Sequence, residues 1–467
     1  MKLASPQDGM LGRGVDVPGK RMVLVGIAAV ALLMAACDYP MYRGSSGHTG
    51  FNATESMISA SNVSTLTEAY IGSLSGIPSS PVVAGGTVYV ETDSKLYAFP
   101  AEGTSSCPGS PRHCQPLWTA STPGGGGGVA GGAPAVANGI VYVQTGSGIN
   151  AYDAAGSSNC SGTPKVCQPL WEYFNANSSP TVFNGVVYAA SGSGNDAVAG
   201  FDAAGNQNCT GTPKVCQPIW TGTGSGSTAS ASTPAVVNGV VYVANSTSLL
   251  AFDGTGKTDC SGTPTVCSPL WSAPTGTTSE IATPAVDSGI AYIVNDSTLT
   301  LYAFDATGTI NCAGSPKTCA PLWTASGVGG APAIANGKVY VDGIVDGTGG
   351  IDAFNTTPTS NCSGSPVVCT PLWSYTAPNF SAFGAPVVAN GVLYSTDANG
   401  NATPGLHAWD ASGTSDCAGT PTVCSPLFSY QSEAPSLGDP AVANGMVYFA
   451  DGDPVHSEQA IFAFKLP

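Results

Sequence analysis

Apolar and polar positions repeat in one order eight times between Pro81 and Phe464. Each copy starts with a Pro-x-Val run, which reads Pro-x-Ile in the sixth copy. It then passes through a polar two-residue turn and continues as an apolar run ending near a Tyr. A further short run in most copies reads Ala-Phe-Asp. The period is roughly 50 residues, within the range of propeller blades and solenoid units. The copies open at Pro81, Pro134, Pro180, Pro234, Pro284, Pro332, Pro386 and Pro440.

The fourth copy shows which elements one unit encodes. Residues 233–236 predict a strand, Asn238-Gly239 is a turn that suits a right-twisted hairpin, and residues 240–243 predict the partner strand. Residues 249–253 predict a third strand, and Trp271 opens a fourth after a loop bounded by two cysteines. Four strands in each unit is the pattern of a propeller blade.

The two ends of the repeat predict how the fold closes. The last copy has only three strands, and residues 66–71 near the start of the repeat supply a matching orphan, with Tyr70 where other copies have Trp. An open solenoid would need polar caps, and neither end resembles one. We therefore predict an all-β fold, an eight-bladed β-propeller of four-stranded antiparallel blades over residues 61–467. An N-terminal outer strand on the last blade closes it and removes both open sheet edges.

Composition and charge agree with an exported all-β chain. Only 9% of residues are charged, and no long segment has a 3.6-residue apolar period. The 13 basic and 29 acidic residues give a net charge of −16. Without residues 1–37, which hold four basic and two acidic residues, the balance is 9 against 27, or −18. Such a surface repels phosphate backbones, so we expect no nucleic-acid partner.

Residues 1–37 are predicted to be a signal peptide, and residues 38–60 a lead-in to the propeller. Lys20 and Arg21 precede an apolar run, residues 22–36, that is too short to cross a ~30 Å hydrocarbon core. The end of that run resembles a bacterial lipobox, which implies cleavage before Cys37 and a lipid on its thiol. A secreted protein or an uncleaved short anchor is the alternative, and Met10 or Met22 could be the true start.

Fourteen further cysteines form seven pairs of identical spacing. Each pair brackets a turn that contains Gly and Pro, which brings the two Cβ atoms together. In an oxidising compartment we expect seven local disulfides, each contributing ~2.5 kcal/mol in the chain-entropy account. Zinc is the alternative, but it needs a second close pair and usually a shorter spacing. The pairs are Cys107 and Cys114, Cys160 and Cys167, Cys209 and Cys216, Cys260 and Cys267, Cys312 and Cys319, Cys362 and Cys369, and Cys417 and Cys424.

The order Pro-x-Val, Asn-Gly, Val-Tyr-Val, Leu-Tyr-Ala-Phe-Asp and Trp resembles the pyrroloquinoline-quinone-type propeller repeat. That repeat occurs in quinoprotein alcohol dehydrogenases and in the barrel-assembly lipoproteins of the BamB type. The Cys-bounded insertion departs from its usual Asp-x-x-Thr-Gly-x-x-x-Trp link. The resemblance implies that one aromatic residue of each unit docks between neighbouring blades. These residues are Trp118, Trp171, Trp220, Trp271, Trp323 and Trp373, with Phe428 and Tyr70 as weaker stand-ins.

The resemblance also raises an enzyme hypothesis. Quinoprotein dehydrogenases hold the quinone against a Trp and a ring of two adjacent, disulfide-linked cysteines, above a calcium ion and a catalytic Asp. This sequence has no Cys-Cys dipeptide, no Cys-x-x-Cys-His and no Gly-x-Ser-x-Gly. His113 and His407 are interpreted as structural or exposed. We expect no catalytic residue, no metal and no cofactor, since neither the quinone nor calcium is supported.

Loop lengths predict where a ligand would bind. In a four-stranded blade the Asn-Gly turns and the Cys loops share one face, and the longest, least repetitive loops lie on the other. Binding residues tend to sit on variable loops held by a rigid frame. Acidic residues gather there in the last three blades, where a calcium site is conceivable, although a solvated acidic rim is the simpler reading. The candidate binding face consists of Asp342, Asp346, Asp397, Asp451 and Asp453.

Together these features predict an exported, lipid-anchored, non-catalytic propeller. We expect a monomer that acts as a binding or scaffolding module at the bacterial cell envelope, held to the membrane through Cys37. Its partner would be an envelope protein or a polysaccharide. The alternative is a divergent quinone-dependent oxidoreductase, which would reduce a dye when quinone and calcium are added.

Overall fold

The computed structural model describes residues 38–110, 112–124, 133–191, 196–224, 232–277, 282–345, 348–359, 361–377, 383–397, 405–432, 438–451 and 459–467. These ranges contain no α-helix, and their one helical element is the 3₁₀ turn η2 (Val63–Thr65). None of these ranges contains a helix long and apolar enough to cross a bilayer. The predicted leader and Cys37 lie outside them, so cleavage and lipidation remain predictions.

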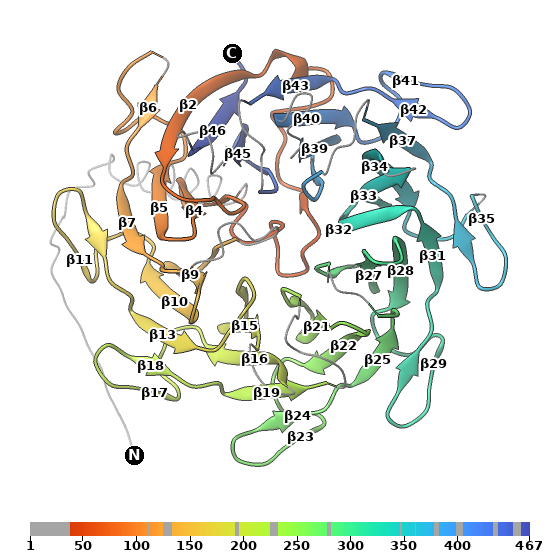
Figure 1. The fold of residues 1–467 in the computed structure, drawn as a ribbon, viewed down its shortest axis with the longest axis horizontal. Coiled ribbons are helices and arrows are strands. Elements are labelled where there is room, and N and C mark those ends of the chain that lie inside the picture. The colour runs from red at the N-terminus through yellow and green to blue at the C-terminus, as the bar shows by residue number, and fades with distance from the viewer. Residues whose placement is uncertain are drawn as a thin grey trace, which may run out of the picture.

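Eight antiparallel sheets surround one axis, which confirms the predicted propeller (Figure 1). From the axis outward, the four core strands of blades 1 to 4 are β3 (Val82–Ala84), β4 (Thr87–Glu91), β5 (Lys95–Pro100) and β7 (Trp118–Ser121); β8 (Ala135–Ala137), β9 (Ile140–Thr145), β10 (Gly148–Asp153) and β13 (Trp171–Phe174); β14 (Thr181–Phe183), β15 (Val186–Ala190), β16 (Asp196–Asp202) and β19 (Trp220–Thr223); β20 (Ala235–Val237), β21 (Val240–Ala244), β22 (Ser248–Asp253) and β25 (Trp271–Pro274).

Blades 5 to 8 follow the same order. Their core strands are β26 (Ala285–Asp287), β27 (Ile290–Asn295), β28 (Thr300–Asp305) and β31 (Trp323–Ser326); β32 (Val328–Ala335), β33 (Lys338–Val345), β34 (Thr348–Asn355) and β37 (Trp373–Thr376); β38 (Val387–Ala389), β39 (Val392–Asp397), β40 (Gly405–Asp410) and β43 (Phe428–Gln431); β44 (Ala441–Ala443), β45 (Met446–Asp451), β46 (Gln459–Lys465) and β2 (Thr67–Leu74).

The two innermost strands of each blade are joined by the predicted tight turns. Asn238 and Gly239 have φ of 53° and 79°, the left-handed values that a hairpin turn of this kind requires at both central positions. Asn and Gly tolerate this conformation better than other residues, which explains why six of the eight turns are spelled Asn-Gly.

Blade 8 is closed by the N-terminal strand, as predicted. Strand β2 pairs antiparallel with β46, from Thr67 opposite Lys465 to Leu74 opposite Gln459. Across the seam the Tyr448 hydroxyl donates to the Ala101 carbonyl at 3.0 Å. The sheet of blade 8 therefore joins the N-terminal strand β2 to the C-terminal strand β46 and closes the ring (Figure 1).

All seven cysteine pairs form disulfides, with Cα atoms 3.9–4.0 Å apart, and each closes a small hairpin. The sequence predicted that these loops share a face with the Asn-Gly turns, but it did not predict the strands with which they pair. Each leaves its own blade and pairs in parallel with the outer strand of the preceding blade, so blades 1 to 6 become six-stranded. The hairpin strands are β6 (His113–Cys114), β11 (Cys160–Ser161), β12 (Val166–Cys167), β17 (Cys209–Thr210), β18 (Val215–Cys216), β23 (Cys260–Ser261), β24 (Val266–Cys267), β29 (Cys312–Ala313), β30 (Thr318–Cys319), β35 (Cys362–Ser363), β36 (Val368–Cys369), β41 (Cys417–Ala418) and β42 (Val423–Cys424).

Blade 7 differs from the other seven blades. It gains a strand at the axis, because β1 (Phe51–Asn52) of the lead-in runs parallel to β38. It gains none at the rim, where the described sheet ends at β43. The reason is that blade 8 takes its outer strand from the N-terminal side, so no Cys hairpin separates β46 from β2.

The core lies between blades, where the apolar faces of neighbouring sheets meet. Trp118 of blade 1 is buried, and its indole N–H donates to the Ala154 carbonyl of blade 2 at 3.1 Å. The Tyr89 hydroxyl donates to the same carbonyl at 3.0 Å. Gly156 has φ of 61°, and a Cβ there would overlap the Trp118 ring, which explains the Gly that follows the third strand. A large aromatic residue buried in this way stabilises each blade-to-blade contact.

Candidate functional site

The lead-in occupies the central channel and contacts all eight blades. Its residues 39–50 exchange backbone hydrogen bonds of 2.5–2.8 Å with the innermost strands of six blades. His48 Nε2 lies 2.9 Å from Thr181 Oγ1 of blade 3, and Asn52 donates to the Val442 carbonyl of blade 8 at 2.8 Å. A ligand on the axis would therefore meet polypeptide. The backbone partners are Val83, Val136, Val236, Val286, Ile334 and Val388.

Arg43 is the charged centre of this axial segment. Its side chain is fully buried, and Nη2 donates to the carbonyls of Pro332 and Pro386 at 2.7 and 3.1 Å. Pro332 lies within the inner strand of blade 6, and Pro386 immediately precedes that of blade 7. Nη1 lies 3.6 Å from Asp439 Oδ2 of blade 8. Asp439 Oδ1 in turn accepts from the Ala385 N–H at 2.8 Å. One cation thus ties three blades together.

Several carboxyl groups lie near this cation. Burial raises the pKa of Asp342 well above its usual range, and the nearby charges of Asp439 and Asp296 raise it further. Burial also raises the pKa of Asp439, although the Arg43 charge opposes that effect. One cation cannot neutralise three carboxylates, so the charged form of Asp342 is disfavoured at this position. Within the described ranges, no three His, Cys, Asp or Glu side chains are placed to hold a metal ion.

The predicted candidate face is only partly described. Asp342 lies in the middle of β33 and is half-buried, whereas Asp397 and Asp451 end β39 and β45 and are buried. Asp346 and Asp453 fall outside the described residues. The candidate face therefore remains a prediction.

Asp397 belongs to a polar row across blade 7. Its Oδ2 lies 4.0 Å from His407 Nε2, and His407 Nδ1 lies 2.9 Å from Ser429 Oγ. Burial lowers the pKa of His407, so the ring is neutral at neutral pH. The Asp-to-His distance exceeds a hydrogen bond. Ser429 also lies within a strand, where neighbouring N–H groups alternate in direction rather than converge on one oxyanion. We interpret the row as cross-strand support.

The aromatic residues expected at the blade boundaries are found there. Trp118, Trp171, Trp220, Trp271, Trp323 and Trp373 are each at most 2% exposed, and Tyr70 is fully buried at the seam. Five of the indoles donate to a carbonyl of the following blade. Phe428 is the exception, since it has no donor and is only half-buried.

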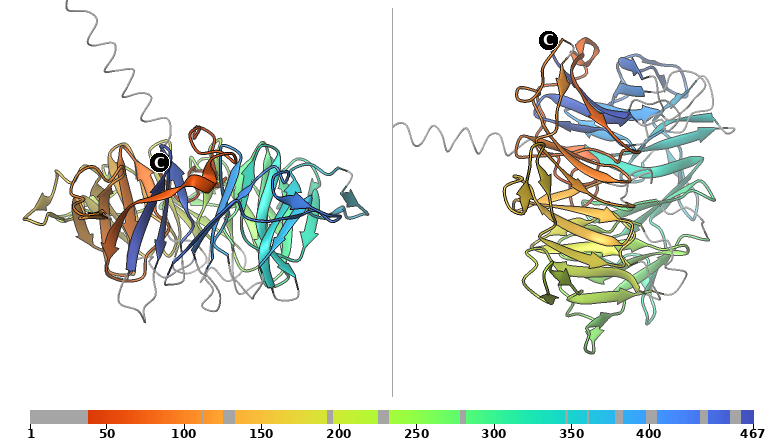
Figure 2. Two further views of the ribbon diagram at one scale, coloured as in Figure 1. Left: turned by 90° about the horizontal axis from the view of Figure 1, so that it is seen from above. Right: turned by 60° about the vertical axis from the view of Figure 1, so that its left-hand side comes forward.

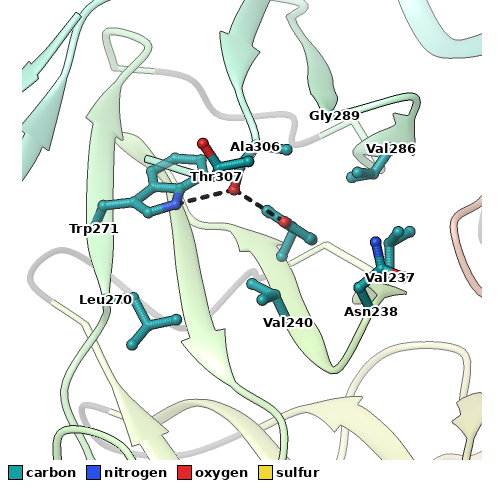
Figure 3. Close-up of a pocket in the computed structure, with 10 residues that line it drawn as sticks. Val237, Asn238, Val240, Leu270, Trp271, Val286, Gly289, Ala306 and Thr307 are labelled. Carbon is teal, nitrogen blue, oxygen red and sulfur yellow. Dashed lines mark hydrogen bonds between the residues drawn. The ribbon is translucent and has the colours of Figure 1, made fainter. Parts of the chain in front are cut away.

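A small, mostly apolar pocket lies between blades 4 and 5. It has a volume of about 300 Å³ and lies on the Asn-Gly turn face, next to Asn238 and Gly289 (Figure 3). At its back, the Trp271 indole and the Tyr242 hydroxyl both donate to the Ala306 carbonyl. These two donors are therefore already paired, and the rest of the lining is apolar except for Asn238, Gly289 and Thr307.

Two larger hollows lie on the rim, of about 570 and 580 Å³. Each is formed where the Pro-containing turn of one Cys hairpin meets the start of the preceding outer strand. The first is lined by Pro169, Leu170 and Lys214, and the second by Pro371, Leu372 and Pro421. The same construction therefore recurs around the ring.

Sequence reasoning missed Arg43 and the axial path of the lead-in. The signal was present, since Arg43 is the only Lys or Arg between residues 22 and 94. A lone basic residue in an uncharged segment that precedes an acidic propeller is a candidate for a buried ion pair.

A family model described as outer membrane protein assembly factor BamB matches residues 65–253 and 216–416. The solved structure of BamB from Moraxella catarrhalis is 13% identical, with a TM-score of 0.55 over 86% of this chain and 99% of that chain. Apo AztD from Citrobacter koseri is 12% identical over 79% and 88%, with a TM-score of 0.43. Hsv2 from Kluyveromyces lactis is 7% identical over 82% and 96%, with a TM-score of 0.37. Structural likeness at these identities shows the fold alone. No curated protein sequence matches this chain.

Proposed function

Because the chain belongs to the family of outer membrane protein assembly factor BamB, we propose that it is a non-catalytic scaffold that binds another protein at the bacterial cell envelope. Seven disulfides and a BamB-like fold fit an extracytoplasmic protein. The proposal adds that the chain is a monomer, is lipidated on Cys37, and holds its partner on the face that carries the long loops.

The occupied axis is the observation that carries this proposal. The lead-in is bonded to every blade, so the channel is a structural core rather than an open cofactor site. The disulfides lie in hairpins at the rim, and none joins adjacent cysteines. What the molecule offers a partner is a rigid outer surface.

The start of the lead-in determines which face is free. Asp38 accepts a hydrogen bond from the Gly85 N–H at 3.0 Å, in the Gly85-Gly86 turn of blade 1, and Tyr39 pairs with Val83. Figure 2 shows the lead-in around η2 and the C-terminal end standing on this same side of the ring. Consecutive Cα atoms are only ~3.8 Å apart. A lipid on Cys37 would therefore hold the turn face against the membrane and leave the long-loop face for the partner.

Site-specific photo-crosslinking in cells tests the binding face. A photoreactive residue replaces exposed Asp93 or Thr298 on the long-loop face, and the matched controls replace exposed Asn138 or Asn184 on the turn face. We expect crosslinks to one envelope protein from positions 93 and 298 only. Crosslinks to that protein from the turn face alone would overturn the proposed orientation.

The anchor and the alternative function have separate tests. We expect mass spectrometry of the mature N-terminus to show lipid on Cys37, and Cys37→Ser to move the protein out of the membrane fraction. An unmodified Cys37 would contradict the anchor. Saturable dye reduction by the purified protein with quinone and calcium would contradict the non-catalytic proposal and favour the oxidoreductase.

A further inference from the structure

The outer strands of the eight blades do not all have the same neighbour. In seven blades a backbone N–H of the outer strand, at the residue after the docking aromatic, donates to a carbonyl of a Cys hairpin at 2.9–3.0 Å. These pairs are Thr119 to Lys165, Glu172 to Lys214, Thr221 to Thr265, Ser272 to Lys317, Thr324 to Val367, Ser374 to Thr422, and Ile71 to Arg112. Ser429 is the equivalent residue of blade 7, and no described residue pairs with the outer edge of its strand.

Side-chain burial shows the same difference. In the outer strand of blade 1, the side chains of Trp118 and Ala120 are buried. In β43 the corresponding Phe428 and Tyr430 are only half-buried, and Ser429 and Gln431 are exposed. Among the described residues, none pairs with the outward backbone N–H of Ser429. A sheet edge of this kind, with partly uncovered aromatic residues beside it, is a template for another strand.

From these observations we infer that the outer edge of β43 is a docking site for an extended segment of a partner protein, which pairs with it in parallel as the Cys hairpins do elsewhere. The seven native occupants define what fits. Each presents a Val, Thr or His followed by Cys, and in four of them the preceding residue is basic: Arg112, Lys165, Lys214 and Lys317.

Charge at the open edge agrees with such an occupant. Glu68 of β2 approaches β43 from blade 8, and its Oε2 lies 3.5 Å from the Tyr430 hydroxyl. A basic side chain in the incoming strand would therefore meet an acidic neighbour. Pairing through backbone groups gives affinity, and the alternate side chains give specificity, as in strand addition to exposed sheet edges. This site is at the rim and does not depend on the lipid anchor or on the long-loop face.

The chain supplies its own probe. A disulfide-closed peptide of residues 158–169 copies the hairpin that covers blade 1, and it is added to the full-length protein. Amide hydrogen exchange is measured by NMR with and without the peptide. We expect the Ser429 amide to exchange faster than those of Thr119 and Thr324 in the free protein, and to become protected when the peptide is added. The same peptide with scrambled sequence should protect nothing.

Two variants locate the interaction. Ser429→Pro removes the outward N–H at a position where an edge strand tolerates proline, and we expect peptide binding to weaken about tenfold, the effect of one lost backbone hydrogen bond. Ser429→Ala keeps the N–H and should bind as the parent does. Equal binding by both variants, or a Ser429 amide that the peptide leaves unprotected, would overturn the inference. If the Ser429 amide becomes protected only as the protein concentration rises, the edge pairs with a second copy of this chain. That result would also contradict the proposal. If Ser429→Pro does not fold, the exchange result on the parent decides alone.

Discussion

The axis and the rim of this propeller differ in whether their stabilising contacts are repeated from blade to blade. At the rim the same contacts recur from blade to blade: a Trp under a Gly, a disulfide hairpin on the preceding outer strand, and a Tyr that donates to the next blade. At the axis a single segment, residues 38–52, contacts all eight blades, and its side-chain contacts through Arg43, His48 and Asn52 each occur once.

This difference shows where stability is concentrated. Loss of one rim contact leaves equivalent contacts intact at the other blades, so its effect is local. Loss of an axial contact affects several blades at once, and no copy replaces it. The following predictions compare the two regions, from the largest expected effect to the smallest.

Replacing Arg43 should be the most damaging single change. Arg43→Met leaves Asp439 buried without its cation, so we expect a loss of about 3–5 kcal/mol in the free energy of unfolding, measured by urea denaturation. Arg112→Met is the matched control at the rim, since Arg112 is exposed and donates only to the Gly103 carbonyl. Similar losses in the free energy of unfolding for both variants would contradict the proposed difference between the axis and the rim. Adding Asp439→Asn to Arg43→Met should recover part of the loss.

Removing one disulfide should cost less. The double variant Cys260→Ser, Cys267→Ser is expected to lose about 2–3 kcal/mol, and its amide exchange should rise in β24 and at the covered edge of β19 only. Exchange that rises evenly around the ring would show that the hairpin has more than a local role.

A glycine comparison isolates the packing of a docking Trp. Gly308 and Gly289 both have positive φ, 65° and 79°, but a Cβ at Gly308 overlaps the Trp271 ring, whereas a Cβ at Gly289 meets no atom within 4 Å. Alanine at either site costs about 1 kcal/mol or more in backbone strain. Gly308→Ala should therefore lower the melting temperature, measured by differential scanning calorimetry, further than Gly289→Ala does. Equal melting temperatures for the two variants would show that the Trp ring moves without cost.

The smallest expected effect is the pH dependence of the stability that the axial residues provide. Burial lowers the pKa of His48 to about 3, below the usual 6.5, so the unfolded chain takes up this proton first as pH falls. The stability that neutral His48 supports is present above pH 6.5 and is lost between pH 6.5 and 3. Asp352 has the opposite sign, since burial raises its pKa to about 6. We expect His48→Asn to flatten the fall of the melting temperature between pH 6.5 and 4.5, and His113→Asn, on the exposed rim, to leave it unchanged.

The repeated part of the fold could be predicted from the sequence, because each signal appeared many times. Seven Pro-x-Val runs, one Pro-x-Ile run and six Asn-Gly turns indicated the blades, and the orphan strand around Tyr70 indicated the seam. Equal spacing of the cysteines indicated the disulfides. It did not indicate that the hairpins would pair with the preceding blade, since a strand of two residues carries no register signal of its own.

The candidate site was harder to predict because its residues are unique. Acidic residues on the long loops suggested a solvated rim, but Asp439 is buried beside an axial cation, Arg43, that only the folded lead-in supplies. A contact between Arg43 and Pro386, which are 343 positions apart, leaves no periodic pattern in the chain.

The pairing of each Cys hairpin with the preceding blade has an evolutionary consequence. Every middle repeat donates one hairpin to its predecessor and accepts one from its successor, so unequal recombination between two copies would insert or delete a whole unit without leaving any donor unmatched. The gene could thus change its copy number freely in the middle of the array. The lead-in, by contrast, has the length that contact with eight blades requires. Selection on that length would hold the number of repeats at eight.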